Sequence, residues 1–275
     1  QHYTRDQRRM KTLEQVDSGD LWKALKAKFP AYQILPDTNF VSYVKNNLVA
    51  SLYTVMKSAS ILPTTEEDKE ICTHLNIALE RVWSLGNFGY LQFQAGTNAA
   101  LFNVGYTQVG WDESLTAGTG NSLYKGNVTL KNINPIKFMR DPFSTSLDTA
   151  GYCCTYDKYH KSVFEENDNY KEQFEWFLRK SKHNDIATPI PQLPGANKTP
   201  DKDYYTLIIF WVKQANKLYE IHVINSDTIL HWKEIKPAIF PIAELYCEDP
   251  GEKLIGTSPC AKVFANNTAF NIMQS

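Results

Sequence analysis

Polar and apolar residues alternate along two neighbouring stretches in the first half of the chain. The stretches Tyr106 to Glu113 and Val128 to Ile133 each have the period of two that is typical of a β-strand. Between them, Ala117 to Ser122 consists of turn-forming residues, and Asn134-Pro135 ends the second stretch. The pattern predicts a β-hairpin and then a corner at Asp141-Pro142, because a residue before proline avoids helical backbone angles.

Helical periodicity dominates before this hairpin. Leu21 to Phe29 and Phe40 to Met56 carry apolar residues at helical spacing, and residues 91–105 have the small and apolar composition of a closely packed helix. A further helix is predicted after Thr64, which has the spacing of a capping box with Glu67. The apolar face of that helix consists of Ile71, Leu75, Leu79 and Val82.

The second half of the chain is richer in strands. Gly151 to Tyr159 is predicted to be a third strand, and residues 168–180 to be a helix. Two further alternating stretches, Tyr205 to Val212 and Leu218 to Ile224, flank a short polar turn and predict a second hairpin.

The last elements settle the fold class that we expect. A short strand is predicted to end at Tyr246, and Ser258 and Pro259 have the residue types of an N-cap and of a first helical position. Helices come first, then strands, then a helix and strands again, without the regular alternation of a βαβ fold. This order predicts an α+β protein.

Composition shifts predict five segments. Residues 1–39 form an N-terminal arm and helix, 40–182 an α+β domain, and 183–203 a loop or linker rich in Pro, Asn, Asp and Thr. Residues 204–259 form a β-hairpin module. Residues 260–275 begin a helix that we expect to continue beyond this chain, since no Gly or Pro ends it.

Composition excludes several classes of function. Apolar residues make up 43% of the 275 residues and aromatic residues 13%, which suits a large core and subunit interfaces. A formal net charge of -1 without a polybasic tract argues against tight, nonspecific nucleic-acid binding. The five cysteines form no regular framework and favour a reducing compartment. No apolar run reaches the roughly 18 residues of a membrane span.

Candidate chemistry is sparse. Cys153 or Cys154 with His160 could form a Cys/His pair, although a buried cysteine and a surface histidine are the simpler interpretation. Gly118 and Gly120 lack the lysine of a phosphate-binding loop and fit a hairpin loop better.

The candidate acidic residues and histidines can also be explained by ordinary structural roles. Asp141, Asp148 and Asp157 could in principle hold Mg²⁺, but Asp141 sits at a turn where Asp is common. His222 and His231 are isolated, as structural or solvated histidines are. We therefore predict no catalytic residue, no cofactor, no metal site and no enzyme activity.

A set of short motifs follows in fixed order along the chain. The motifs are Ile61–Thr64 with the helix to Trp83, Trp111-Asp112, Gly126–Pro135, Arg140–Pro142 with Asp148 and Tyr152, Leu218–His222, Phe240–Ile242, Gly256–Ser258 and Phe270-Asn271. In this order they resemble the portal proteins of tailed double-stranded DNA bacteriophages, and the resemblance covers roughly residues 40–275. A second long stem helix, a tunnel loop and a C-terminal crown have no counterpart here, and we expect them after Ser275.

The resemblance implies a structural subunit without catalysis. Residues 40–182 would be a helical and β-rich wing, and residues 204–259 would belong to the wing or the clip. Copies would form a ring, usually a dodecamer, at one capsid vertex of the virion, after assembly in the host bacterial cytoplasm. Double-stranded DNA would pass through the channel without sequence specificity during packaging and ejection. The implied partners are the terminase large subunit, head-tail adaptor proteins and the major capsid or scaffolding protein, with no membrane.

Two other functions remain open from the sequence. One is a cytosolic cysteine-dependent hydrolase that uses Cys153 or Cys154 with His160. The other is a virion adaptor protein that is not a portal.

Overall fold

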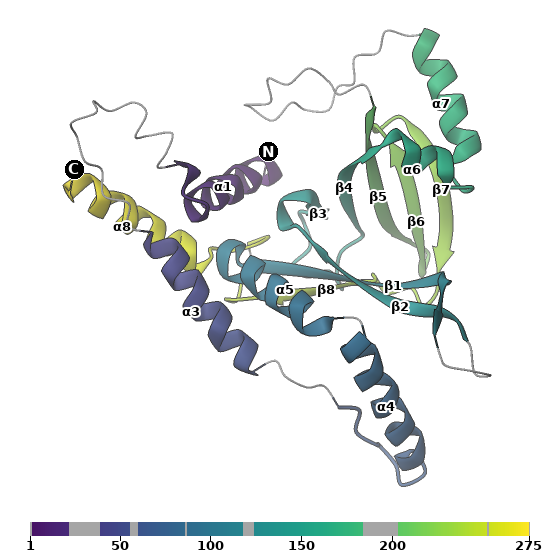
Figure 1. The fold of residues 1–275 in the computed structure, drawn as a ribbon, viewed down its shortest axis with the longest axis horizontal. Helices are drawn as coiled ribbons and strands as arrows, with labels where there is room; N and C mark the ends of the chain where they lie inside the picture. The colour runs from purple at the N-terminus through teal and green to yellow at the C-terminus, as the bar shows by residue number, and fades with distance from the viewer. Residues whose placement is uncertain are drawn as a thin grey trace. The chain divides into compact units, whose positions relative to one another are not determined.

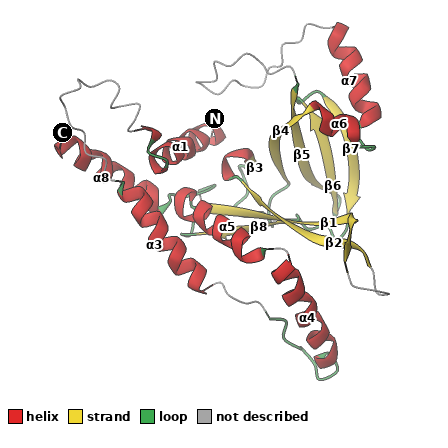
Figure 2. Ribbon diagram, in the orientation of Figure 1, coloured by secondary structure: helices red, strands yellow, loops and turns green. Residues whose placement is uncertain are grey.

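The computed structural model describes residues 2–21, 39–55, 60–85, 87–117, 124–183, 203–251 and 253–274. Across these residues it contains seven α-helices and two antiparallel sheets of three and five strands, so the α+β class is confirmed (Figure 2). Residue contacts divide the chain into two compact units. Unit 1 is Gln1–Ile136 with Pro241–Ser275, and unit 2 is Lys137–Phe240.

The helices of unit 1 are α1 (His2–Asp17), α3 (Phe40–Val55), α4 (Lys69–Leu85), α5 (Phe88–Phe102) and α8 (Pro259–Gln274), and its strands are β1 (Val104–Ala117), β2 (Tyr124–Ile133) and β8 (Ile242–Tyr246). Helix α5 lies against the sheet, and α3 and α8 pack beside α5 (Figure 1). The approach is close because the buried positions of α5 include Ala95, Gly96, Ala99 and Ala100. The predicted close-packed helix is confirmed, although it ends at Phe102.

The first predicted hairpin is confirmed. Strands β1 and β2 pair antiparallel from Tyr106 opposite Ile133 to Ala117 opposite Tyr124. The turn at residues 118–123 lies outside the described residues. On its other edge β1 pairs with β8, from Val104 opposite Tyr246, which also confirms the short strand ending at Tyr246.

The N-terminal arm is helical and belongs to the core of unit 1. Met10, Leu13 and Val16 of α1 are buried. The amide of Asn39 donates to the carbonyl of Val16 at 3.1 Å, so the start of α3 is tied to the end of α1. The helix predicted at Leu21 to Phe29 lies almost wholly outside the described residues.

Of the two predicted helix caps, the cap of α8 is found and the capping box before α4 is not. The backbone N–H of Ala261 donates to Ser258 Oγ at 3.0 Å, which confirms the cap of α8. The capping box predicted for Thr64 and Glu67 is wrong by one residue. Asp68 precedes α4 and accepts hydrogen bonds from the hydroxyl and the backbone N–H of Thr65, because its short carboxylate can reach both donors.

Unit 2 is a five-stranded antiparallel sheet in the order β3-β4-β5-β6-β7, with two helices. The strands are β3 (Phe138–Arg140), β4 (Tyr152–His160), β5 (Tyr204–Gln214), β6 (Lys217–Ile224) and β7 (Thr228–Ile235), and the helices are α6 (Lys161–Glu166) and α7 (Lys171–His183). The predicted third strand and second hairpin are confirmed as β4 and as β5 with β6. A two-residue turn joins β5 to β6, and both of its residues, Ala215 and Asn216, have positive φ.

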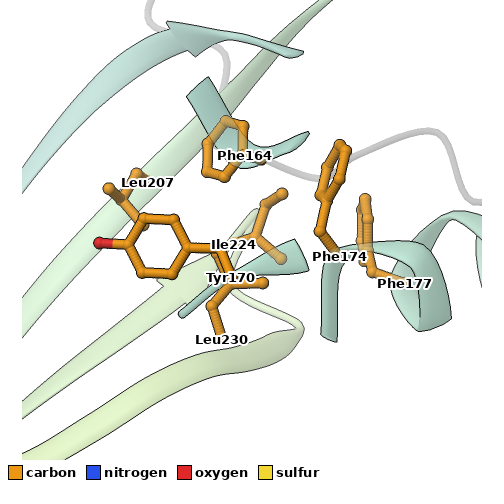
Figure 3. Packing of buried hydrophobic residues seen from close by; sticks show 7 residues of the cluster. All are labelled: Phe164, Tyr170, Phe174, Phe177, Leu207, Ile224 and Leu230. Carbon is orange, nitrogen blue, oxygen red and sulfur yellow. The ribbon is translucent and has the colours of Figure 1, made fainter. Parts of the chain in front are cut away.

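The core of unit 2 lies between the helices and one face of this sheet (Figure 3). Phe164, Tyr170, Phe174 and Phe177 pack against side chains from three different strands. Those side chains are Leu207, Ile224 and Leu230. The helix predicted for residues 168–180 is therefore found, although it begins at Lys171.

Three elements of unit 2, β3, α6 and β7, have no counterpart in the sequence prediction. Strand β3 is only three residues long, so no alternation is visible in it. Helix α6 is only six residues long, which is too short for a helical period to be visible. Strand β7 follows a tight turn at Asn225 and Ser226, both with positive φ, and contains a register shift opposite His222. That shift breaks the period of two on which the prediction depends.

The compact units differ from the predicted segments. Strand β4 pairs with β5 from Tyr152 opposite Val212 to His160 opposite Tyr204. Residues on either side of the predicted linker at 183–203 thus share one sheet, although we placed them in separate modules. Within that linker, residues 184–202 lie outside the described residues.

Candidate functional site

The proposed Cys/His pair is not formed. Cys153 and Cys154 are buried near the start of β4, and burial raises the pKa of Cys154 to about 12. His160 ends the same strand six residues after Cys154, which is about 20 Å along an extended strand. Its Nδ1 accepts the N–H of Ser162 and caps α6. The geometry therefore does not favour thiolate chemistry with this histidine.

The three aspartates have structural contacts. Asp141 Oδ1 accepts the backbone N–H of Phe143 at 3.0 Å, which forms the turn expected at Asp141-Pro142. Asp157 pairs with Lys137 at 2.7 Å, and the carbonyl of Asp148 accepts from Lys213. Within the described part of the chain, no group of three or more His, Cys, Asp or Glu side chains could hold a metal ion.

A buried polar network in unit 2 was missed by the sequence analysis. Glu220 on β6 accepts hydrogen bonds from Trp211 Nε1 at 2.9 Å, from His222 Nε2 at 2.9 Å and from Lys233 Nζ at 3.1 Å. The other ring nitrogen of His222 lies 2.5 Å from the hydroxyl of Tyr170. One chain of hydrogen bonds thereby joins strands β5, β6 and β7 to the turn before α7.

The electrostatics of this network suit a structural role. Burial alone would raise the pKa of Glu220, but the hydrogen bond from His222 and the charge of Lys233 outweigh it and hold the pKa at about 2. Burial, followed by the negative charge of Glu220, raises the pKa of Tyr170 to about 12. Glu220 and Tyr170 are each only 8% exposed. The network consists of an ionised carboxylate and a neutral phenol that are sheltered from solvent.

Three residues of the motifs that carry the resemblance also have structural contacts. A Cβ added to Gly126 would lie 2.3 Å from the indole of Trp111, so the indole covers the glycine across the hairpin. Arg140 is 1% exposed and its guanidinium donates to the carbonyl of Thr145. Gly256 faces the amide of Asn103, which binds the backbone of the 247–256 loop.

The face of the unit 2 sheet that points away from α6 and α7 is apolar. We call it the outer face, and its apolar residues include Tyr152, Ile208, Phe210, Val212, Tyr219, Ile221, Val223, Ile229 and Trp232. The opposite, inner face holds Leu207, Trp211, Leu218 and Ile224, all buried, and both helices of the unit contact that side. Among the described residues of unit 2, no helix covers the outer face.

Part of the outer face is exposed, whereas Cys154, which lies opposite Phe210 on it, is buried. Trp232 is 64% exposed, Ile229 54% and Tyr152 42%, and the other six residues are half-buried among their sheet neighbours. A contiguous apolar patch of this kind on a protein surface typically marks an interaction site.

Helix α4 has a second uncovered apolar surface. On one side Cys72 is buried, and Asn76 exchanges two hydrogen bonds with the backbone of Ile61. On the adjacent side Ile71 and Leu75 are 59% and 47% exposed. The apolar face predicted for this helix is present, but the described chain covers only half of it.

No protein-family model matches the chain, and no curated protein sequence matches it significantly. Among the described helices, none has both the length and the apolar character that crossing a bilayer requires.

Proposed function

We propose that this chain is a structural subunit that works by assembling with copies of itself into a ring, as the portal of a tailed bacteriophage. The observation that carries the assembly proposal is the pair of uncovered apolar surfaces, the outer face of the unit 2 sheet and the open side of α4. The portal identity is carried by the ordered motifs, from Ile61–Thr64 to Phe270-Asn271.

Two different apolar surfaces on one chain suit a ring better than a dimer. A two-fold dimer uses one self-complementary patch, whereas a ring joins two unlike patches head to tail. A sheet face and a helix side are unlike in shape and lie on different units. Each copy would offer one surface to the preceding copy and the other to the following copy.

The remaining parts of the proposal follow from the family. The ring, usually a dodecamer, would sit at a capsid vertex of the virion and conduct double-stranded DNA during packaging and ejection. It would bind the terminase large subunit, head-tail adaptor proteins and the major capsid or scaffolding protein. A net charge of -1 supports a channel that lets DNA pass without gripping it.

Negative-stain electron microscopy and mass photometry of the full-length protein test this function. We expect closed rings of a single copy number over a range of salt concentrations, since apolar contacts are little screened by salt. A protein that stays monomeric at every salt and protein concentration would overturn the proposal.

A further inference from the structure

We propose that the open side of α4 in one copy packs on the outer face of the unit 2 sheet in the next copy. This inference rests on the proposed ring and assigns the two surfaces that form its subunit contact. A helix laid on a sheet is one of the few stable ways to bury a sheet face.

The open side of α4 is a continuous apolar stripe. Ile71, Leu75, Ala78 and Val82 recur at steps of four, three and four residues, which places them on one side of a helix. Ile71, Leu75 and Ala78 are exposed and Val82 is half-buried. The stripe extends over about 17 Å of a 17-residue helix that is about 25 Å long.

The outer face has matching dimensions. Five strands spaced by about 4.8 Å give a face roughly 20–25 Å across. Its centre is Phe210 and Ile221, which are register partners on β5 and β6, with Trp232 opposite Ile221 on β7. A helix of the length of α4 therefore spans the sheet without projecting far beyond it.

Charge favours the same pairing. The charged residues on the outer face, Lys158, Lys217 and Glu234, lie at the ends of strands, and Lys217 pairs with Glu234 at 3.4 Å. On α4 the stripe itself contains no charged residue, and Glu70 and Arg81 lie beside it. Docking the two surfaces would bury no unpaired charge, which would otherwise oppose association.

The buried area explains why a ring is needed. A helix about 25 Å long and 10 Å wide buries on the order of 600 Å² in total against a sheet. This is about half of the 1,200 Å² at which stable interfaces begin. One contact alone is weak, so the geometry points to assembly by ring closure, in which every copy makes the contact twice and the closing contact is intramolecular.

Disulfide trapping between two differently labelled full-length chains tests the pairing. One chain carries Leu75→Cys on the stripe and the other carries Ile221→Cys at the centre of the outer face. After mild oxidation of the mixture we expect a disulfide-linked heterodimer. The matched control is Ile77→Cys, which is 60% exposed but lies on the other side of α4. We expect at least about a tenfold lower yield from it, because a disulfide needs Cα atoms about 4.4–6.8 Å apart.

Each other outcome overturns the pairing. Absence of the mixed disulfide, or a yield equal to that of the Ile77→Cys control, rejects contact between the two surfaces. Homodimers of the Leu75→Cys chain indicate helix-to-helix packing instead. A disulfide within single chains of a Leu75→Cys/Ile221→Cys double variant indicates that α4 packs on the sheet of its own chain.

Measuring ring formation in variants distinguishes failure of this contact from failure of the proposed function. We expect Leu75→Glu to abolish rings and Ile77→Glu to retain them, with both variants folded by circular dichroism. If wild-type rings form and Leu75→Glu leaves them intact, the pairing is wrong and the ring function stands. If the wild type forms no rings while the mixed disulfide forms, the function is wrong and the contact stands.

Discussion

The hydroxyl of Tyr170 lies 2.5 Å from Nδ1 of His222 and joins the residue before α7 to the middle of strand β6. Glu220 accepts a hydrogen bond from the other ring nitrogen of His222, so the carboxylate, the imidazole and the phenol form one hydrogen-bonded chain.

Removal of this hydroxyl is expected to destabilise unit 2. Tyr170→Phe keeps the ring in the core and leaves His222 Nδ1 without its hydrogen-bond partner, which costs about 1–2 kcal/mol of unfolding free energy. Urea unfolding measures the change. Tyr204→Phe is the control, since Tyr204 is half-exposed and its ring contact with His160 is kept. Equal stability of the two variants would contradict the role given to the Tyr170 hydroxyl.

We expect the lowered pKa of Glu220 to make the unfolding free energy depend on pH in the acid range. Its pKa is held at about 2 in the folded protein, below its ordinary value of 4.5. A carboxylate with a depressed pKa contributes stability above its unfolded pKa, and the contribution is lost as pH falls from 4.5 towards 2. Over that window we expect on the order of 3 kcal/mol to be lost in the wild type.

Replacing this carboxylate tests the pH dependence. Glu220→Gln is less stable at neutral pH, and its unfolding free energy should fall less steeply between pH 4.5 and 2, because the titrating group is gone. Urea unfolding at several pH values in this range gives the slopes. Glu234→Gln, an exposed partner of Lys217, should retain the wild-type slope. A Glu220→Gln slope equal to that of the wild type would rule out this carboxylate as the cause.

Gly126 is expected to tolerate no side chain. Its φ is +91° and an added Cβ would lie 2.3 Å from the indole of Trp111. Gly126→Ala combines backbone strain with a clash and should lower the unfolding free energy by about 2 kcal/mol or more. Gly251→Ala has positive φ in open space and isolates the strain alone, at about 1 kcal/mol. Thermal unfolding compares the two variants.

A second substitution separates the two causes at Gly126. Trp111→Ala removes the indole, so Gly126→Ala should be less harmful in that background than in the wild type. An unchanged effect would show that backbone strain alone accounts for the loss.

The sequence predicted elements whose signals are local, and it failed where the signal is a distant partner. Alternation over Val128 to Ile133 was enough to predict the hairpin, and Ser258 with Pro259 was enough to predict the cap of α8. The Tyr170–His222 bond joins residues 52 positions apart, so nothing near either residue indicates it. His222 and His231 therefore looked isolated in the sequence.

In helix α4 the local signal was correct, but the sequence could not show what packs on the predicted face. Its periodicity predicted an apolar face correctly, but periodicity cannot tell what covers that face. Leu79 is half-buried and Ile71 is exposed, although they were assigned to one face together. The sequence does not give the burial of each residue, which separates the exposed half of this face from the covered half.

Asn103 gives the sharpest prediction for unit 1. Its fully buried amide donates to the carbonyls of Ile255 at 2.7 Å and Glu248 at 3.0 Å and accepts the N–H of Glu248 at 3.0 Å. Asn103→Asp replaces the donor with a carboxylate that repels both carbonyls, so we expect a loss of about 2–4 kcal/mol in urea unfolding and faster proteolysis of the 247–256 loop. Asn216→Asp is the control, because Asn216 also has positive φ but is exposed. If both variants lose the same stability, the backbone angle and not the buried amide explains why asparagine occupies position 103.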